Sequence, residues 1–300
     1  MEVSVCIATY RRPDGLSRLL RSLELQRGNL PDFEIVIVDN DATGSAAKVC
    51  AEFADRLRLR YLVEASRGIA AARNRAVAAS AGRFLAFIDD DEEADPNWLT
   101  SLRRVMELHN ADGVFGPVVV RLAQDSPAWI SQSGFFDYPA LPTGAVVPWY
   151  WTRTSNAYVR RDALPDKDAP FDRKLDLIGG EDVDLFARMI DRGARFIAAA
   201  DAVVFEYRST ARSNFRWMIR RSFRNGGTFA HVTCRRRPRG ARFRFGIRAL
   251  GEASAFLLRA IYRLGDSRIA AFRHCLRSIE SLGKAAWAVG LVHSEYRLQT

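Results

Sequence analysis

The feature that most constrains this fold is an alternation of short apolar runs with segments of helical periodicity over residues 3–89. The runs VSVCIA (3–8) and FEIVIVD (33–39) are nearly continuous in apolar residues, as strands buried on both faces of a parallel sheet are. Between them, DGLSRLLRSLEL spaces its leucines as a helix does, behind the start signals Pro13 and Asp14. The pattern therefore predicts a βαβ unit.

The same alternation continues along the chain. We expect a second helix in AAKVCAEFADRL, a third strand in LRYLVE, a third helix in GIAAARNRAVAASA and a fourth strand in RFLAFID. This order predicts an α/β fold with a mostly parallel, Rossmann-like doubly wound sheet flanked by helices. Ligands bind such sheets outside the carboxyl ends of the strands, so we expect the functional site at that edge.

The pattern loosens from about residue 112. GVFGPVVVRL (113–122) predicts one strand, and GGEDVDLFARMIDRG predicts a helix whose first turn is acidic. An aromatic, proline-rich stretch without periodicity separates them. We expect a main domain at residues 1–207, divided into halves 1–111 and 112–207, and a basic helical region at 208–300.

The formal net charge of +10 is concentrated in that C-terminal region. Residues 206–300 hold 20 Lys and Arg against 5 Asp and Glu, whereas the residues before them hold 25 against 30. Within it, GIRALGEASAFLLRAIYRLG predicts an amphipathic helix with apolar residues three, four and seven apart: Ile247, Leu250, Leu257, Ile261 and Leu264. Two uses of this apolar face stay open, namely packing against the main domain and lying on an anionic membrane surface.

Cysteine usage and hydropathy set the expected compartment. The four cysteines show neither metal-binding nor disulfide-framework spacing, which favours a reduced cytoplasmic protein. We expect no signal peptide, because no basic segment followed by a long apolar run opens the chain. We also expect no transmembrane helix, because no run approaches the roughly 20 apolar residues that a span needs.

Five consecutive carboxylates follow the fourth predicted strand, in FLAFIDDDEEADPNWL (84–99). Like charges this close need a cation or hydrogen-bond donors to compensate them. A nucleoside diphosphate bound with Mg²⁺ or Mn²⁺ suits the pattern, because the acids at 89–91 offer the oxygen ligands that these ions prefer. Asp39, at a neighbouring strand end, is suited to bind the base, and Arg67 and Arg73 are suited to bind phosphates.

Five segments, in this order, resemble the family 2 glycosyltransferases with the GT-A fold, particularly the bacterial exopolysaccharide branch typified by succinoglycan glucosyltransferases. They are VSVCIATYRRPDGLSRLLRSL, FEIVIVDN, RGIAAARNRAVAASAGRFLAFIDDDEEADPNWL, SNAYVRR and GGEDVDLFARMIDRG. The resemblance covers roughly residues 1–230. It implies inverting transfer of a hexose, expected to be glucose, from a UDP-sugar to a saccharide acceptor, expected to be lipid-linked.

The resemblance also implies roles for single residues. Asp182 matches the general base, with Glu181 beside it, and Asp91 matches the direct metal ligand, with Asp89 near it. Glu206 stands where many relatives carry a His that completes the metal shell, and an ion pair with an arginine of the C-terminal region is its other reading. In all, nine residues are expected to bind the nucleotide sugar: Thr9, Tyr10, Arg11, Asp39, Arg67, Arg73, Asn74, Asp89 and Asp90.

The acceptor is expected to meet residues after the aromatic stretch. Sugars stack on aromatic faces, so Trp149 and Trp151, with Ser155 and Asn156, are candidates, and a structural role for the tryptophans stays open. The resemblance adds Arg212 and Arg221, for contact with the acceptor's lipid diphosphate or with donor phosphates. A lipid acceptor and a basic tail together imply a peripheral position on the inner face of the cytoplasmic membrane.

Two other classes of function are weighed against this one. A metal-dependent nucleotidyltransferase would also use clustered acids, but no glycine-rich phosphate loop with a lysine follows the first strand. A non-catalytic protein whose basic tail binds nucleic acid would leave the acidic residues without a role. The leading hypothesis is therefore a sugar transferase, and no nucleic-acid partner is expected.

Overall fold

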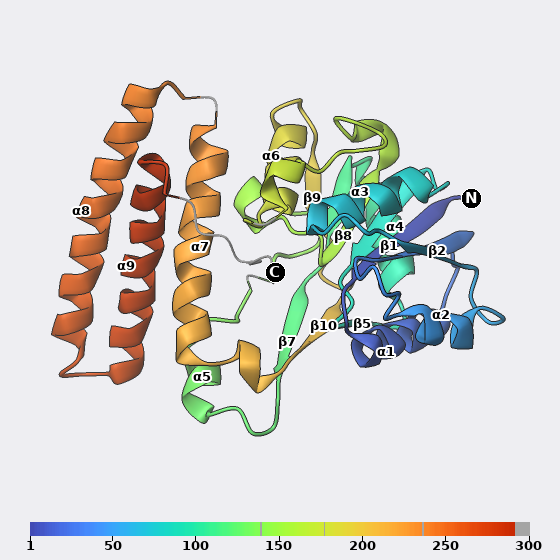
Figure 1. Ribbon diagram of the computed structural model, residues 1–300, viewed down its shortest axis with the longest axis horizontal. Helices are drawn as coiled ribbons and strands as arrows, with labels where there is room; N and C mark the ends of the chain where they lie inside the picture. The colour runs from blue at the N-terminus through green and yellow to red at the C-terminus, as the bar shows by residue number, and fades with distance from the viewer. Residues whose placement is uncertain (139, 177, 236, 292–300) are drawn as a thin grey trace. The chain divides into compact units, whose positions relative to one another are not determined.

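The computed structural model describes residues 1–138, 140–176, 178–235 and 237–291 (Figure 1). The chain divides into two compact units. The first comprises the described parts of 1–120, 138–177 and 181–207, and the second comprises those of 121–137, 178–180 and 208–300.

Seven strands form the large sheet of the first unit, in the order β3-β2-β1-β4-β8-β6-β9. Strands β3, β2, β1 and β4 are parallel to one another, β8 is antiparallel to both β4 and β6, and β9 is parallel to β6. The predicted mostly parallel sheet is thereby confirmed. The strand bounds are β1(Val3–Thr9), β2(Phe33–Asp39), β3(Leu59–Val63), β4(Phe84–Ile88), β6(Gly113–Phe115), β8(Asn156–Arg160) and β9(Phe196–Ala198).

Helices cover both faces of this sheet, and each face has its own apolar cluster. Residues alternate between the faces along a strand, so Val5 and Ile7 of β1 join one cluster while Cys6 joins the other. The first cluster includes side chains of α1(Pro13–Glu24), α2(Ala47–Phe53) and α4(Trp98–His109), and the second includes those of α3(Ile69–Ala79) and α6(Glu181–Ile190). Short 3₁₀ turns connect other segments: η1(Trp149–Trp151), η2(Arg161–Ala163), η3(Arg173–Leu175) and η4(Thr210–Arg212).

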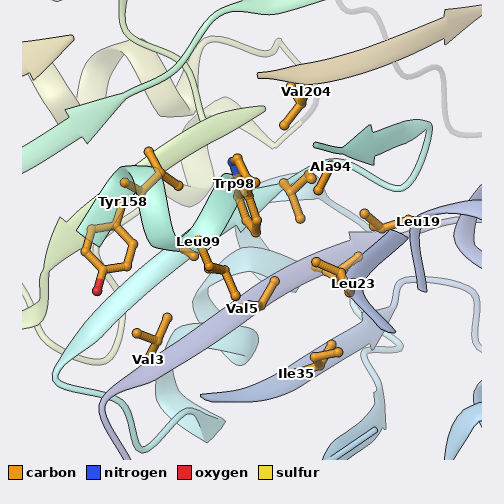
Figure 2. Packing of buried hydrophobic residues seen from close by; sticks show 14 of the residues in the cluster. Val3, Val5, Leu19, Leu23, Ile35, Ala94, Trp98, Leu99, Tyr158 and Val204 are labelled. Carbon is orange, nitrogen blue, oxygen red and sulfur yellow. The ribbon is translucent and has the colours of Figure 1, made fainter. Parts of the chain in front are cut away.

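Trp98 lies at the centre of the first cluster (Figure 2). The indole is fully buried beside Leu99, and Leu19 and Leu23 of α1 belong to the same cluster as Val5 of β1 (Figure 2). A buried indole N–H needs an acceptor, and here Trp98 Nε1 donates to Asn156 Oδ1 at 2.9 Å. The start of β8 is thus tied to α4.

The segment 113–122 is two strands rather than the predicted one. Its first part is β6 of the large sheet, and its second part, β7(Val118–Leu122), joins β5(Glu92–Ala94) and β10(Val204–Arg208) in a small sheet of order β5-β10-β7. Gly116 and Pro117 separate the two strands. Proline cannot donate to a ladder, and a Cβ at Gly116 would collide with the carbonyl oxygen of Ala202, so the chain leaves the large sheet there.

Helices dominate the second unit: α5(Ala128–Gln132), α7(Phe215–Cys234), α8(Arg239–Arg263) and α9(Arg268–Ala288). Helix α9 packs against both α7 and α8 (Figure 1). Two glycines allow the close approach of α7 and α9, because a Cβ at Gly226 would collide with the Glu280 carbonyl and a Cβ at Gly283 with the Phe223 carbonyl. Among the described residues, no helix combines the length and hydropathy that a membrane span requires.

The predicted amphipathic helix of the C-terminal region is α8, and its large apolar side chains are not buried. Ala249, Ala253 and Ala260 form its buried face. The residues on which the prediction was based are all exposed: Ile247, Leu250, Leu257, Ile261 and Leu264. Packing against the main domain and lying on an anionic membrane surface both stay open as uses of that apolar face.

Two leucines of α4 test the packing of the first cluster. Leu102 is fully buried, whereas Leu108 is 71% exposed. Leu102→Ala is expected to lower the free energy of unfolding by about 2–5 kcal/mol, because it leaves a cavity in the core, and Leu108→Ala to change it by under about 0.5 kcal/mol. Urea denaturation followed by tryptophan fluorescence measures both, and equal effects would contradict this placement of α4.

Candidate active site

Polar ends of the parallel strands meet at one edge of the large sheet. The backbone N–H of Asn40, just after β2, donates to the carbonyl of Thr9 at 2.8 Å. The Thr9 hydroxyl donates to Asp90 Oδ2 at 2.8 Å, which ties the end of β1 to the acidic turn after β4. Residues from three strand ends are thus held together by direct hydrogen bonds.

Arg12 supplies positive charge to the acidic turn. Its Nη1 lies 2.8 Å from Asp90 Oδ1 and 2.7 Å from Asp91 Oδ2. The two carboxylates are 6% and 18% exposed, so the pairing compensates charges that have little access to water. The acidic run predicts a cation here, but the motifs do not point to Arg12. The available signal was its position between the end of the first strand and Pro13 at the helix start.

Helix α1 approaches the acidic turn through a glycine. A Cβ at Gly15 would lie 2.6 Å from the carbonyl oxygen of Asp90, so a larger residue would push the first turn of α1 away. The positive end of the helix dipole therefore faces the acids. Burial nevertheless raises the pKa of Asp90 to about 6, with Arg12 opposing the rise and Asp91 reinforcing it.

Arg73 joins the acidic turn to the start of α6. Its Nη2 donates to Asp89 Oδ1 at 2.9 Å, and its Nη1 donates to Glu181 Oε1. Burial on its own lowers the pKa of Arg73, but the carboxylates of Asp89, Glu181 and Asp182 outweigh it and raise that pKa. One buried guanidinium therefore holds two acidic segments that lie about ninety residues apart in the sequence.

Glu181 and Asp182 have different environments although they are neighbours. Glu181 is buried, and burial raises its pKa to about 7, with Arg73 opposing and Asp182 reinforcing the rise. Asp182 is only half-buried, and its Oδ1 accepts a hydrogen bond from the N–H of Val183 at 2.8 Å. Of these two acids, Asp182 is the more exposed.

Asp39 lies at the edge, at the end of β2, with its carboxylate fully buried. That carboxylate accepts hydrogen bonds from the Ala46 N–H at 2.8 Å, the Tyr61 hydroxyl at 3.0 Å and the Ser45 hydroxyl at 3.3 Å. It therefore fixes the loop between β2 and α2. A direct contact with a nucleotide base stays a prediction for this residue.

Two arginines lie against Tyr10, just beyond the end of β1. The guanidinium carbons of Arg11 and Arg67 are 5.2 and 5.0 Å from the centroid of its ring, within the range of cation–π attraction. Arg11 has a positive φ of 52° and donates through Nε to Asp41 Oδ2 at 2.9 Å. The structure thus gathers these three predicted nucleotide-binding residues, none of which is buried.

Two predicted binding residues make hydrogen bonds that connect parts of the first unit. The amide of Asn74 donates to the Phe171 carbonyl at 2.9 Å and accepts from the Phe171 N–H at 2.8 Å. Asn156, fully buried, donates to the carbonyls of Pro117 and Ala202 as well as accepting from Trp98. Asn156 is therefore not placed at an acceptor surface, because its whole amide is used to connect strands and loops of the core.

The aromatic turn η1 carries three of the predicted acceptor-binding residues or lies next to them, and acceptor binding there stays a prediction. Trp149, Trp151 and Ser155 are half-buried, and Tyr150 between the tryptophans is 54% exposed. Trp151 also lines a cavity of about 40 Å³ beside Tyr138 and Arg153. That volume suits a few water molecules.

Three further predicted site residues come later in the sequence than the elements described so far. Glu206, on β10, is paired in register with Glu92 of β5. Arg212 lies in η4 and Arg221 in α7, both in the second unit, where the guanidinium of Arg221 is 5.8 Å from the ring centroid of Trp217. Glu92 itself is not among the predicted site residues.

Glu92 is a buried acid directly behind the acidic turn. It is 1% exposed, its Oε2 accepts from the Asp89 N–H at 2.8 Å, and its Oε1 has no hydrogen-bond partner among the residues that the structure describes. Burial raises its pKa well above the ordinary value, with contributions from Asp89 and Glu206. A protonated Glu92 fits this environment, and its hydrogen bond fixes the backbone at the first acid of the turn.

The donor chemistry of the acidic turn suits a divalent cation. Among the residues that the structure describes, no three His, Cys, Asp or Glu side chains are grouped to hold a metal, so Asp89, Asp91 and Glu206 do not form a complete shell. Magnesium sites at phosphates commonly use only one or two carboxylates, with the phosphates and water supplying the other ligands. Asp89 and Asp91, 39% and 18% exposed, fit that arrangement.

Known structures share this architecture. Over 97% of this chain and 92% of the other, the fold matches Staphylococcus aureus TarS 1–349 in complex with UDP, with a TM-score of 0.58 and 17% identity. It also matches the mannosyltransferase PcManGT from Pyrobaculum calidifontis in complex with GDP-Man and Mn²⁺, with a TM-score of 0.55, 16% identity and coverage of 96% and 74%. The fold is therefore the GT-A glycosyltransferase fold, and members with this fold bind nucleotide sugars and Mn²⁺.

Comparison of sequences identifies the family within this fold to which the chain belongs. Residues 4–164 match the family model described as "Glycosyl transferase family 2". The chain is also 30% identical over 301 residues to the succinoglycan biosynthesis protein ExoM of Rhizobium meliloti (strain 1021), covering 98% of this chain and 95% of that protein. The protein belongs to glycosyl transferase family 2 and is related to proteins of succinoglycan biosynthesis. This membership favours a sugar transferase over the nucleotidyltransferase and nucleic-acid-binding alternatives.

Adjacent arginines test the charge balance of the acidic turn. Arg12→Gln is expected to lower the free energy of unfolding by about 2 kcal/mol, because buried Asp90 then loses its cation. Arg11→Gln is the matched control, and since its side chain is 57% exposed and its ion pair is screened by water, it should cost clearly less than Arg12→Gln. Chemical denaturation at neutral pH measures both, and a larger cost for Arg11→Gln would contradict the pairing described here.

Proposed function

We propose that this protein transfers a hexose from a nucleoside diphosphate sugar to a saccharide acceptor, with inversion at the anomeric carbon. The observation that carries the proposal is the double contact of Arg73, which bonds Asp89 of the acidic turn and Glu181 at the start of α6. That contact holds the acids suited to a donor diphosphate near Asp182, the acid suited to an acceptor hydroxyl. The acids proposed for the donor and the acid proposed for the acceptor are thus held by contacts of one arginine, Arg73.

The donor is proposed to be a UDP-sugar, with glucose as the hexose. TarS, a structural neighbour, has been solved with UDP, and the residues at the strand ends of this chain are those expected for a nucleotide. The arginines that lie against Tyr10 offer donors for phosphate oxygens, and the tyrosine ring offers a face on which a base can stack.

A divalent metal, Mn²⁺ or Mg²⁺, is proposed to bind with the donor. Asp91, with Asp89, would hold it together with the diphosphate of the donor. When bound, it would neutralise the negative charge that develops on the departing diphosphate. Arg12 contacts Asp91 in the structure, so this arginine must share the acid with the metal or turn toward the diphosphate.

The transfer is proposed to be a single in-line displacement. As an acceptor oxygen forms its bond to the anomeric carbon, the carboxylate of Asp182 takes the hydroxyl proton. The bond from the anomeric carbon to the diphosphate oxygen breaks, and the nucleoside diphosphate leaves with the bonding electrons. Glu181, buried and bonded to Arg73, positions the start of α6 and does not itself take that proton.

The acceptor is proposed to be a lipid-linked saccharide of exopolysaccharide or another surface polysaccharide. The relationship to a succinoglycan biosynthesis protein supports this class, and Trp149, Trp151 and Ser155 of the first unit supply a surface for sugar rings. Arg212 and Arg221 are proposed to contact diphosphate groups. With a lipid-linked acceptor, the protein would work peripherally on the inner face of the cytoplasmic membrane, with its C-terminal region against the lipid.

Asp182→Asn tests the assignment of the base. We expect transfer from UDP-glucose to a membrane-extract acceptor to fall by two to four orders of magnitude, about the contribution of a general base, with UDP binding retained. Asp191→Asn, an exposed acid just after the same helix, is the control and should keep full activity. EDTA should abolish the wild-type rate and added Mn²⁺ restore it.

The opposite results are equally informative. A rate for Asp182→Asn within tenfold of wild type would remove this residue from the mechanism. Full activity of the wild type in EDTA would remove the metal.

A further inference from the structure

Helix α3, which carries Arg73, begins without a capping side chain of its own. The first backbone N–H groups of a helix have no acceptor within the helix, and a side-chain oxygen of the N-cap residue commonly accepts from one of them. In α3 the N-cap residue is Gly68, which has no side chain for this purpose. The acceptor for the start of α3 must therefore come from another part of the chain.

Asp176, which directly follows η3, supplies that acceptor from 105 residues further along the chain. Its Oδ1 accepts from the N–H of Ala71 at 3.0 Å, and Ala71 is the third residue of α3, a position that an N-cap side chain ordinarily serves. Gly68 leaves the room for it, because a Cβ there would overlap the carboxyl group of Asp176. Asp176 thus acts as an N-cap that the fold brings to α3 from a distant segment.

The carboxylate of Asp176 is shielded from water, so this contact carries weight. The side chain is 10% exposed, and its ion pair with Arg173, at 3.2 Å, is made by an arginine that is itself 58% exposed and therefore screened. The positive end of the α3 dipole is a second partner for the negative charge. A donor phosphate at the same N–H groups would meet this buried carboxylate, so the start of α3 does not suit the diphosphate.

A second contact binds the same segment one turn further along α3. Asn74 follows Ala71 by three residues, which places it on the same side of the helix. Its amide accepts from the N–H of Phe171 at 2.8 Å and donates to the carbonyl of Phe171 at 2.9 Å. Phe171 and Asp176 are the two ends of the segment 171–176, so both ends of this segment are bonded to α3.

A third contact from α3 reaches the start of α6. Arg73 donates to Oε1 of Glu181, which comes five residues after Asp176 in the sequence. Glu181 is followed directly by Asp182, the acid proposed as the base. Helix α3 therefore holds the chain at both ends of 171–176 and again at the residue before the proposed base.

We propose that Asp176 is a positioning residue for Asp182. By capping α3 it fixes the segment that leads into α6, and so fixes where the carboxylate of Asp182 lies. The inference rests on the proposed function for the role of Asp182, and it adds a residue that touches neither donor nor acceptor. In this proposal Asn74 serves the same segment rather than the nucleotide sugar. Loss of the cap should slow transfer without weakening the binding of UDP.

Kinetics of Asp176→Ala and Asp176→Asn test the role of the cap. We expect Asp176→Ala to lower kcat for transfer from UDP-glucose to a membrane-extract acceptor by about ten- to a hundredfold, the cost of a small displacement of a reacting group. Its Kd for UDP with Mn²⁺ should stay unchanged. Asp176→Asn should stay within about threefold of wild type in kcat, because asparagine caps a helix about as well as aspartate. Asp168→Ala, which alters an exposed acid between β8 and α6, is the control and should change neither quantity.

Hydrogen exchange measured by mass spectrometry tests the same coupling without donor or acceptor. Asp176→Ala should speed exchange in the peptides that cover α3 and α6, because local opening of the capped segment becomes easier. Asp176→Asn should speed it in neither helix. Peptides that cover α4, in the other apolar cluster of the first unit, should exchange as in wild type and show that the effect is local.

Asn74→Ala keeps the test decisive if Asp176→Ala folds poorly. It removes both bonds to Phe171 at the other end of the segment. We expect faster exchange in α6 and a lower kcat, again with the Kd for UDP unchanged. A weaker binding of UDP by this variant would instead return Asn74 to the nucleotide-sugar site and contradict its place in the proposal.

The other outcomes are equally decisive. An Asp176→Ala variant with the exchange and kcat of wild type would overturn the proposal. Faster exchange confined to α3 would do the same, because the cap would then not hold α6. A loss of UDP affinity as large as the loss of kcat would show that Asp176 acts on the donor. Wild type that transfers no sugar would refute the proposed function, and exchange alone would then decide whether Asp176 couples α3 to α6.

Discussion

The site depends on two arginines that make a dense group of carboxylates compatible with a folded sheet edge. Arg12 bonds Asp90 and Asp91, and Arg73 bonds Asp89 and Glu181. Without them the acids after β4 and at the start of α6 would repel one another where water is largely excluded. The pairing also links distant elements, because Arg12 precedes α1 and Arg73 belongs to α3. The same contacts therefore compensate the charge of the carboxylates and position the elements that carry them.

These contacts divide the acids by what each can do. Glu181 and Glu92 are buried and have raised pKa values, so they fix backbone and arginine positions. Asp89 and Asp182 are more exposed and so remain available to a ligand. A transferase needs this division, since the acids that meet the donor and acceptor must be accessible while their supports stay rigid.

Elements with strong hydrophobic periodicity could be predicted from the sequence. Features that depend on contacts between distant parts of the chain could not. The first four strands and α6 follow from apolar runs and helix-start signals, and the fold class follows from their alternation. The split of 113–122 needed a tertiary contact, the Ala202 carbonyl against Gly116. Sequence motifs do not show that the amide of Asn156 bonds to core groups, or that Arg12 is the cation beside Asp91. Nor do they show that many large side chains of α8 are exposed. Residue spacing alone determines none of these contacts.

Binding of UDP to the purified protein tests the central claim most directly, because the account makes the acidic turn a nucleoside diphosphate site that works with a metal. Isothermal titration would compare wild type and Asp91→Asn with Mn²⁺ and with EDTA, and Asp201→Asn, which alters a 67% exposed acid, as the control. The account predicts that wild type and Asp201→Asn bind UDP much more tightly with Mn²⁺, and that Asp91→Asn loses this dependence. UDP binding that is indifferent to both Mn²⁺ and Asp91 would contradict it.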